Sequence, residues 1–226
     1  QTRTNSRLAA AIAEYERVDR RFDPLTSSSE GDREALRRLP DASEESRQAL
    51  RAELVRLQAM VERVPERRLS PEDEVNRAYL LRVITERLEG LDLDFARAPI
   101  SNGDGFFTFG DYLAYTTPIQ SRDDAEAWLA RLEALPTFYL QNIANARRGI
   151  ATGYTQPEIV IAQALATARG QITRLEGTLM TPLDGMQASV IPPEEQNALR
   201  ARARTVIQEQ ILPVHREAVA FMESEY

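Results

Sequence analysis

Apolar residues recur at alternating steps of four and three along much of this chain, and that spacing restricts it to packed helices. Leu50, Leu54, Leu57, Val61 and Val64 follow one another in this way. Because an α-helix turns once in about 3.6 residues, these side chains form one apolar stripe along a helix face. Such a stripe needs another helix to cover it, so the pattern predicts helix-on-helix packing.

The ends of two long helices are marked by capping residues. Ser43 precedes two acids and is typical of an N-cap, and Pro65 ends that helix. Ser70-Pro71 opens the next helix, with Asp73 three residues after the serine. Only a short loop separates the two segments, so they are predicted to form an antiparallel hairpin.

The same signals predict the rest of the architecture. Further helices are expected over 6–21, 121–135, 136–149, 155–172 and 192–226. Pro136 is expected to open one of them, and Pro213 to kink the last. Residues 22–42 and 178–191 are expected to be loops, with a short turn at 33–38, and no strand is predicted. The fold class is therefore all-α, an array of about seven helices including antiparallel hairpins, with 1–226 as a single helical domain.

A long irregular loop is predicted over residues 98–120, where glycines and prolines interrupt the helical period. It carries the aromatic residues Phe106, Phe107, Phe109, Tyr112 and Tyr115. A loop of this length is either packed onto the core by its aromatic side chains or used for binding. Packing is the favoured interpretation, and binding of a peptide or another amphipathic ligand is the alternative.

Composition excludes several classes of function. The net charge of -7 argues against a general nucleic-acid binder. All 28 basic residues are arginines, which excludes a Schiff-base lysine. With no cysteine, disulfides, thiolate nucleophiles and cysteine-bound zinc are excluded. No apolar run reaches about 18 residues, so no membrane span is predicted.

The only histidine, His215, does not belong to a metal motif. Arg216 follows it where a zinc motif needs Glu, and Val219 stands where the second His would be. Leu212 replaces the Glu of a Glu-x-x-His pair. His215 is therefore interpreted as a surface or interhelix residue rather than a base or ligand. No catalytic, cofactor-binding or metal-ligating residue is predicted in this chain.

Acids that lie one or two residues apart are the other candidate functional residues, since paired carboxylates can transfer protons or bind calcium. The pairs are Asp92/Asp94, Asp123/Asp124 and Glu194/Glu195. The last two lie in predicted first helical turns, where the helix dipole already favours acids. Asp92 and Asp94 have no such explanation. Asn102-Gly103-Asp104-Gly105 resembles part of a calcium loop but lacks the distal Glu, which favours a plain turn.

From about Phe22 onward the chain resembles the N-terminal part of a bacterial family called "domain of unknown function 885". The segments that carry the resemblance are, in order, LPDAS (39–43), LSPED (69–73), SRDDAEAWLARLEALP (121–136), QNIANARRG (141–149), GYTQP (153–157), ILPVH (211–215) and FMESEY (221–226). The resemblance implies a mostly helical protein of several hundred residues that looks like a zinc metallopeptidase. It implies a His-Glu-x-x-His-type motif in the C-terminal half and, in many members, an export signal.

The last predicted helix reaches Tyr226 without a C-cap. We therefore expect a longer protein, in which Phe221 and Met222 pack against a C-terminal half that also holds the zinc. Gln1 is not an initiator residue, so a segment is expected upstream. The sequence does not fix the compartment, and the resemblance favours a periplasmic or secreted protein.

Two main hypotheses for function remain, beside the least favoured one of a purely structural scaffold. In the first, the chain is the N-terminal helical portion of a zinc-dependent peptidase, inactive alone, which forms a wall of the cleft for a peptide substrate. In the alternative, it is a stand-alone helical binding module that uses the 98–120 segment or the end of the last helix. No zinc ligand is carried over from the family onto any residue of this chain.

Overall fold

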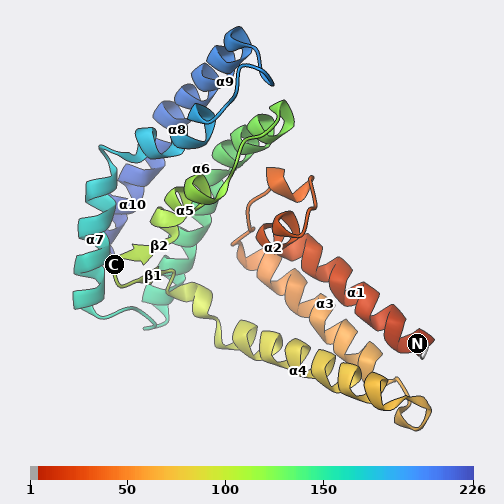
Figure 1. The fold of residues 1–226 in the computed structure, drawn as a ribbon. Coiled ribbons are helices and arrows are strands. Elements are labelled where there is room, and N and C mark those ends of the chain that lie inside the picture. Colours follow the sequence, from red (N-terminus) through yellow and green to blue (C-terminus); the bar gives the residue numbers. More distant parts are fainter. Residues whose placement is uncertain (1–4) are drawn as a thin grey trace.

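The computed structural model describes residues 5–226, so Gln1 lies outside it, and it confirms the all-α class. Figure 1 shows the helices as two groups that meet near the end of α4. The α-helices are α1 (Ser6–Phe22), α2 (Pro24–Ser29), α3 (Glu44–Glu62), α4 (Pro71–Leu93), α5 (Phe109–Thr116), α6 (Arg122–Ala151), α7 (Glu158–Gln171), α8 (Leu175–Asp184), α9 (Pro193–Val206) and α10 (Leu212–Ser224).

Short irregular elements connect them. They are the 3-10 turns η1 (Ala35–Arg37), η2 (Glu66–Arg68), η3 (Phe95–Arg97) and η4 (Phe106–Thr108), the π-helical segment η5 (Ile207–Ile211), and the strands β1 (Ile100–Ser101) and β2 (Asp104–Gly105). The two strands are antiparallel, with Ile100 opposite Gly105. No helix in the described part of the chain is both long and apolar enough to cross a membrane.

The first group contains α1, α3 and α4, and it has a hydrophobic cluster of its own. Its buried residues are Ala11, Val18, Leu54, Leu57, Val61, Leu80, Ile84 and Leu88. The predicted caps are present: the Ser43 hydroxyl accepts the Ser46 N–H at 3.1 Å, and the Ser70 hydroxyl accepts the Asp73 N–H at 3.2 Å. The hairpin of α3 and α4 is therefore confirmed, and Figure 1 shows the two helices joined by a short connection. The stripe residues Leu54, Leu57 and Val61 are buried in this cluster.

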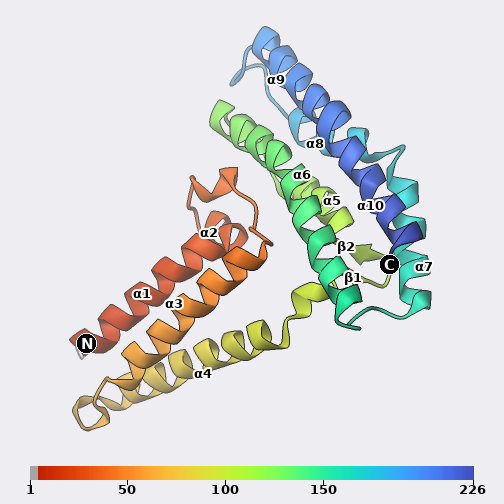
Figure 2. The ribbon, with the colours of Figure 1, turned by 180° about the vertical axis from the view of Figure 1, so that it is seen from behind.

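In the second group, which Figure 2 shows from behind, α9 and α10 pack against the long helix α6, α7 packs against α10, and α8 packs against α5 and α9. Trp128 on α6 is fully buried, and its indole N–H donates to the Leu179 carbonyl at 3.2 Å. Phe221 and Met222 are only 2% and 4% exposed, because they lie in this same core. The expectation that these two side chains await another half of the protein is therefore wrong.

Helix α6 corrects the expectation that Pro136 opens a new helix. The helix runs without interruption past Pro136 to Ala151. A proline within a helix loses one backbone hydrogen bond. Here Leu135 and Tyr139, on either side of it, are buried in the core, and that packing keeps the helix continuous. Before Pro213, the π-helical segment Ile207–Ile211 interrupts the regular α-helical hydrogen bonding, and the kink at Pro213 stays a prediction.

Three predicted loops contain helices. Residues 22–42 include α2 and η1, and residues 178–191 include much of α8, whose Pro182 is buried inside the helix. The segment 98–120 holds the β1–β2 hairpin, η4 and α5 rather than one irregular loop. These helices have between six and ten residues. Such short helices are held by tertiary packing, so periodicity alone does not reveal them.

Candidate functional site

His215 lies on α10 inside the second core and is completely buried. Its Nε2 is 2.8 Å from the Ala168 carbonyl oxygen, which can only accept, so Nε2 carries a proton. Its Nδ1 lies 3.2 Å from the Tyr139 hydroxyl oxygen, whose single proton is donated to the Phe107 carbonyl at 2.7 Å. Burial lowers the pKa of His215, which favours the neutral ring. His215 therefore joins α10 to α6 and α7, as an interhelix histidine.

A buried amide and a carboxylate lie close to this histidine. Gln171 is fully buried and donates to Asp111 Oδ2 at 2.8 Å. Within the described residues, Asp111 Oδ1 and Gln171 Oε1 have no hydrogen-bond partner. Because all these groups are fixed in the core between α5, α7 and α10, we interpret them as a structural polar network.

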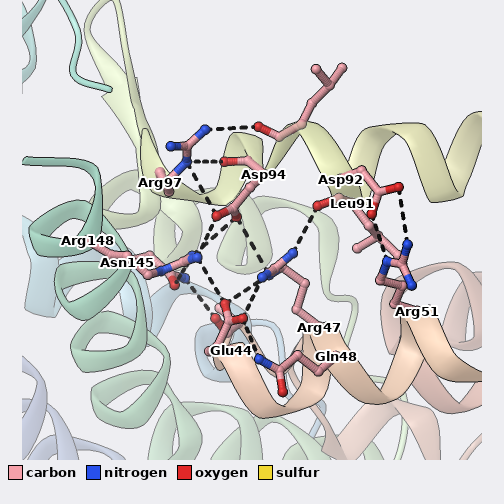
Figure 3. A network of polar contacts seen from close by, with 12 residues as sticks. Glu44, Arg47, Gln48, Arg51, Leu91, Asp92, Asp94, Arg97, Asn145 and Arg148 are labelled. Atoms are coloured by element: carbon pink, nitrogen blue, oxygen red, sulfur yellow. Dashed lines mark hydrogen bonds and ion pairs between the residues drawn. The ribbon is translucent and has the colours of Figure 1, made fainter. Parts of the chain in front are cut away.

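Asp94 is the centre of a network of ion pairs at the junction of the two groups, drawn in Figure 3. Its carboxylate lies 2.5 Å from Arg148 on α6, 3.3 Å from Arg97 and 3.6 Å from Arg47 on α3. Asp94 also has a left-handed backbone, with φ of 53°, which ends α4. Asp92, only two residues away, points elsewhere and pairs with Arg51 at 2.7 Å. The two acids therefore do not form a joint site.

Arginines also form ion pairs with members of the other two candidate acid pairs. Asp123 binds Arg33 at 2.8 Å and also pairs with Arg37. Asp124 accepts the Ser121 hydroxyl at 2.8 Å as part of the cap of α6. The Arg33 guanidinium lowers the pKa of the Asp123 carboxyl, so it stays charged.

The remaining acids are also engaged locally. Glu195 pairs with Arg122 at 2.5 Å, while Glu194 is an exposed residue of the first turn of α9. In the 102–105 segment, Asp104 accepts the Gly105 N–H at 2.7 Å, and Gly103 has φ of 73°, as in a tight turn. Among residues 5–226, no three His, Asp or Glu side chains come together in a way that could hold a metal ion.

Two cavities flank η1, where the first group meets the second. One has a volume of about 360 Å³ and lies between α2, η1, α5 and α6. The other, of about 560 Å³, lies between η1, α1, α3 and α6. Tyr112 of the aromatic segment lines the first cavity and is 57% exposed, whereas Phe106 and Phe107 are buried. The aromatic residues thus divide between packing and an accessible surface.

Sequence reasoning missed Arg131, which lines the first cavity and is only 4% exposed. A signal was present in the sequence. Arg131 stands three residues after Trp128 and four before Leu135, so it lies on the apolar face of its helix. A charged residue in that position needs partners or a ligand.

Comparison with known proteins gives one family. A family model described as "Bacterial protein of unknown function (DUF885)" matches residues 24–226. Among curated proteins, the comparison found no match.

Proposed function

The chain belongs to the bacterial DUF885 family, and on that premise we propose that it forms one wall of the substrate cleft in a zinc-dependent peptidase. The resemblance of its segments to the N-terminal part of that family supports the proposal. In the proposed enzyme this region packs against a catalytic C-terminal half, contacts a peptide substrate, and has no activity alone.

The observation that carries the proposal is that the candidate ionisable side chains are engaged in contacts between helices. Asp94, Asp123 and Glu225 bind arginines from distant parts of the sequence, and His215 bonds within the core. Their contacts fix helix positions instead of presenting reactive groups. A cleft wall needs such rigidity, because binding to a preformed surface loses less conformational entropy.

The described residues do not fit a zinc ion. His215 Nε2 is already bound to the Ala168 carbonyl at 2.8 Å, and no cluster of three potential ligands exists among residues 5–226. Zinc sites in proteins need three or four such ligands. In the proposed enzyme, this region therefore supports the catalytic half, and the metal ligands lie outside this 226-residue chain.

The test compares the protein encoded by the complete reading frame with the 226-residue chain. Both are purified at neutral pH without chelator, and metal content is measured together with cleavage of a peptide library. We expect about one zinc per molecule and chelator-sensitive cleavage in the complete protein, and neither in the 226-residue chain. A complete protein that binds no zinc, or whose peptide cleavage survives metal removal, would contradict the proposal.

A further inference from the structure

The cavity of about 360 Å³ beside η1 has an apolar wall and one buried cation. Leu25, Leu36, Leu113 and Trp128 contribute apolar side chains to it. Its volume lies within the range of about 300–1,000 Å³ that is common for small-molecule sites. Pockets of this kind use a few polar groups to orient an otherwise apolar ligand.

The cation is Arg131, whose guanidinium has only neutral partners. Its Nε donates to the Arg38 carbonyl at 3.3 Å, and its Nη2 contacts the Ser28 hydroxyl at 3.1 Å and the Ala35 carbonyl at 3.4 Å. No carboxylate in the described part of the chain pairs with it, and Nη1 makes no hydrogen bond there. Burial lowers the pKa of Arg131, because a charge removed from water is disfavoured.

The other charged residues around the cavity do not neutralise Arg131. Arg33 and Asp124 also line it, and they pair with each other at 2.8 Å. Asp124 is further occupied by the Ser121 hydroxyl at 2.8 Å. The lining therefore keeps one uncompensated positive charge in a protein whose net charge is -7.

We propose that this cavity binds a small amphipathic carboxylate, with the carboxylate on Arg131 and the apolar part against Trp128 and Leu113. A guanidinium and a carboxylate form paired, charge-assisted hydrogen bonds, which are stronger than neutral ones. Such a ligand would supply the counter-charge that the site lacks, and the apolar wall would cover its hydrocarbon part. The ligand is either a free organic acid or the C-terminal residue of a peptide. This inference does not rest on the peptidase proposal.

Tryptophan fluorescence is a direct probe of ligand binding in this cavity, because Trp128 is the only tryptophan of the protein and lies in the cavity wall. The 226-residue chain is titrated with 3-phenylpropionate and with N-acetylleucine while tryptophan fluorescence is recorded. The first represents a free organic acid and the second a peptide C-terminus. The probe that binds with the higher affinity identifies which of the two kinds of ligand the cavity takes. The matched neutral and cationic probes are 3-phenylpropanol and 3-phenylpropylamine.

We expect saturable binding of at least one carboxylate, and at least about tenfold weaker binding of the alcohol and the amine. Arg131→Gln should weaken carboxylate binding by about tenfold or more, because it removes the charge. Arg147→Gln serves as the control. It removes an arginine from the same helix that pairs with Glu225, away from the cavity, and should leave binding unchanged.

A second variant covers the case in which Arg131→Gln does not fold. Thr116 is exposed at the cavity edge, so Thr116→Phe should block entry while Arg131 stays in place. Circular dichroism confirms the fold of each variant. Equal binding of carboxylate and alcohol, no saturable response to either acid, or unchanged binding in folded Arg131→Gln or Thr116→Phe would each overturn the proposal.

Discussion

The imidazole of His215 is enclosed by the second core, with a backbone carbonyl on one side and the Tyr139 hydroxyl on the other. Burial is the largest influence on its pKa and lowers it. The hydrogen bond to the Ala168 carbonyl and the charge of Asp111 oppose this shift, while Arg174 and Arg216 add to it. Because a charged ring would lose its hydration without gaining a carboxylate in direct contact, the neutral form is favoured.

We predict that His215 titrates below its ordinary pKa of about 6.5. The folded state then binds fewer protons than the unfolded state, so this contribution to stability is fully present above pH ~6.5 and is lost as the pH falls through the folded pKa. The protein has one histidine, so in a tag-free sample the imidazole C–H resonances all belong to His215 and can be followed by NMR. A midpoint at or above that of the urea-unfolded chain would show the interpretation to be wrong.

At the scale of elements, capping residues predicted where the long helices begin. Ser43 and Ser70 cap α3 and α4, as their position before acidic residues predicted, and Ser121 caps α6 in the same way. The prediction that Pro136 begins a new helix was wrong, because a proline occurs both at helix starts and, where packing supports it, inside a helix. The position of Arg131 on an apolar helix face was readable, but the cavity beside it was not, because α2 and η1 are too short to leave a periodic signal.

Close packing between elements depends on Gly149 of α6. A Cβ at this position would lie 2.2 Å from the Arg97 carbonyl oxygen and 2.7 Å from that of Tyr154. Both are backbone atoms, so Gly149→Ala should lower the free energy of unfolding by about 1–3 kcal/mol. Gly90 lies within α4, where an added methyl group would meet nothing within 4 Å, so Gly90→Ala should raise it by about 0.5–1 kcal/mol. Urea unfolding measures both, and equal effects would refute the argument.

At the scale of the whole molecule, two helical groups with separate hydrophobic clusters are joined at Asp94. The sequence predicted the apolar stripe of α3 and its hairpin with α4, and it described residues 1–226 as a single helical domain, which stays a prediction. It showed Asp94 only as an unexplained acid, because its arginine partners on α3 and α6 lie 47 and 54 residues away in the chain. Contacts between residues so far apart leave no local pattern to read.

Asp94→Asn should therefore loosen the junction. Asparagine tolerates the left-handed backbone, so the change removes the charge while the shape of the α4 end is kept. We expect a loss of about 1.5–3 kcal/mol in unfolding free energy, as for hydrogen bonds to charged groups. Hydrogen exchange should become faster at the start of α3, in η3 and near the end of α6.

Asp92→Asn is the matched control, since it makes the same change of charge two residues away. Its partner Arg51 belongs to the same helical group, and the pair is exposed, so the junction is not involved. Exchange in α6 should stay as in the unaltered protein. Should both variants accelerate exchange in α6 equally, net charge rather than the Asp94 network would be what holds the two groups together.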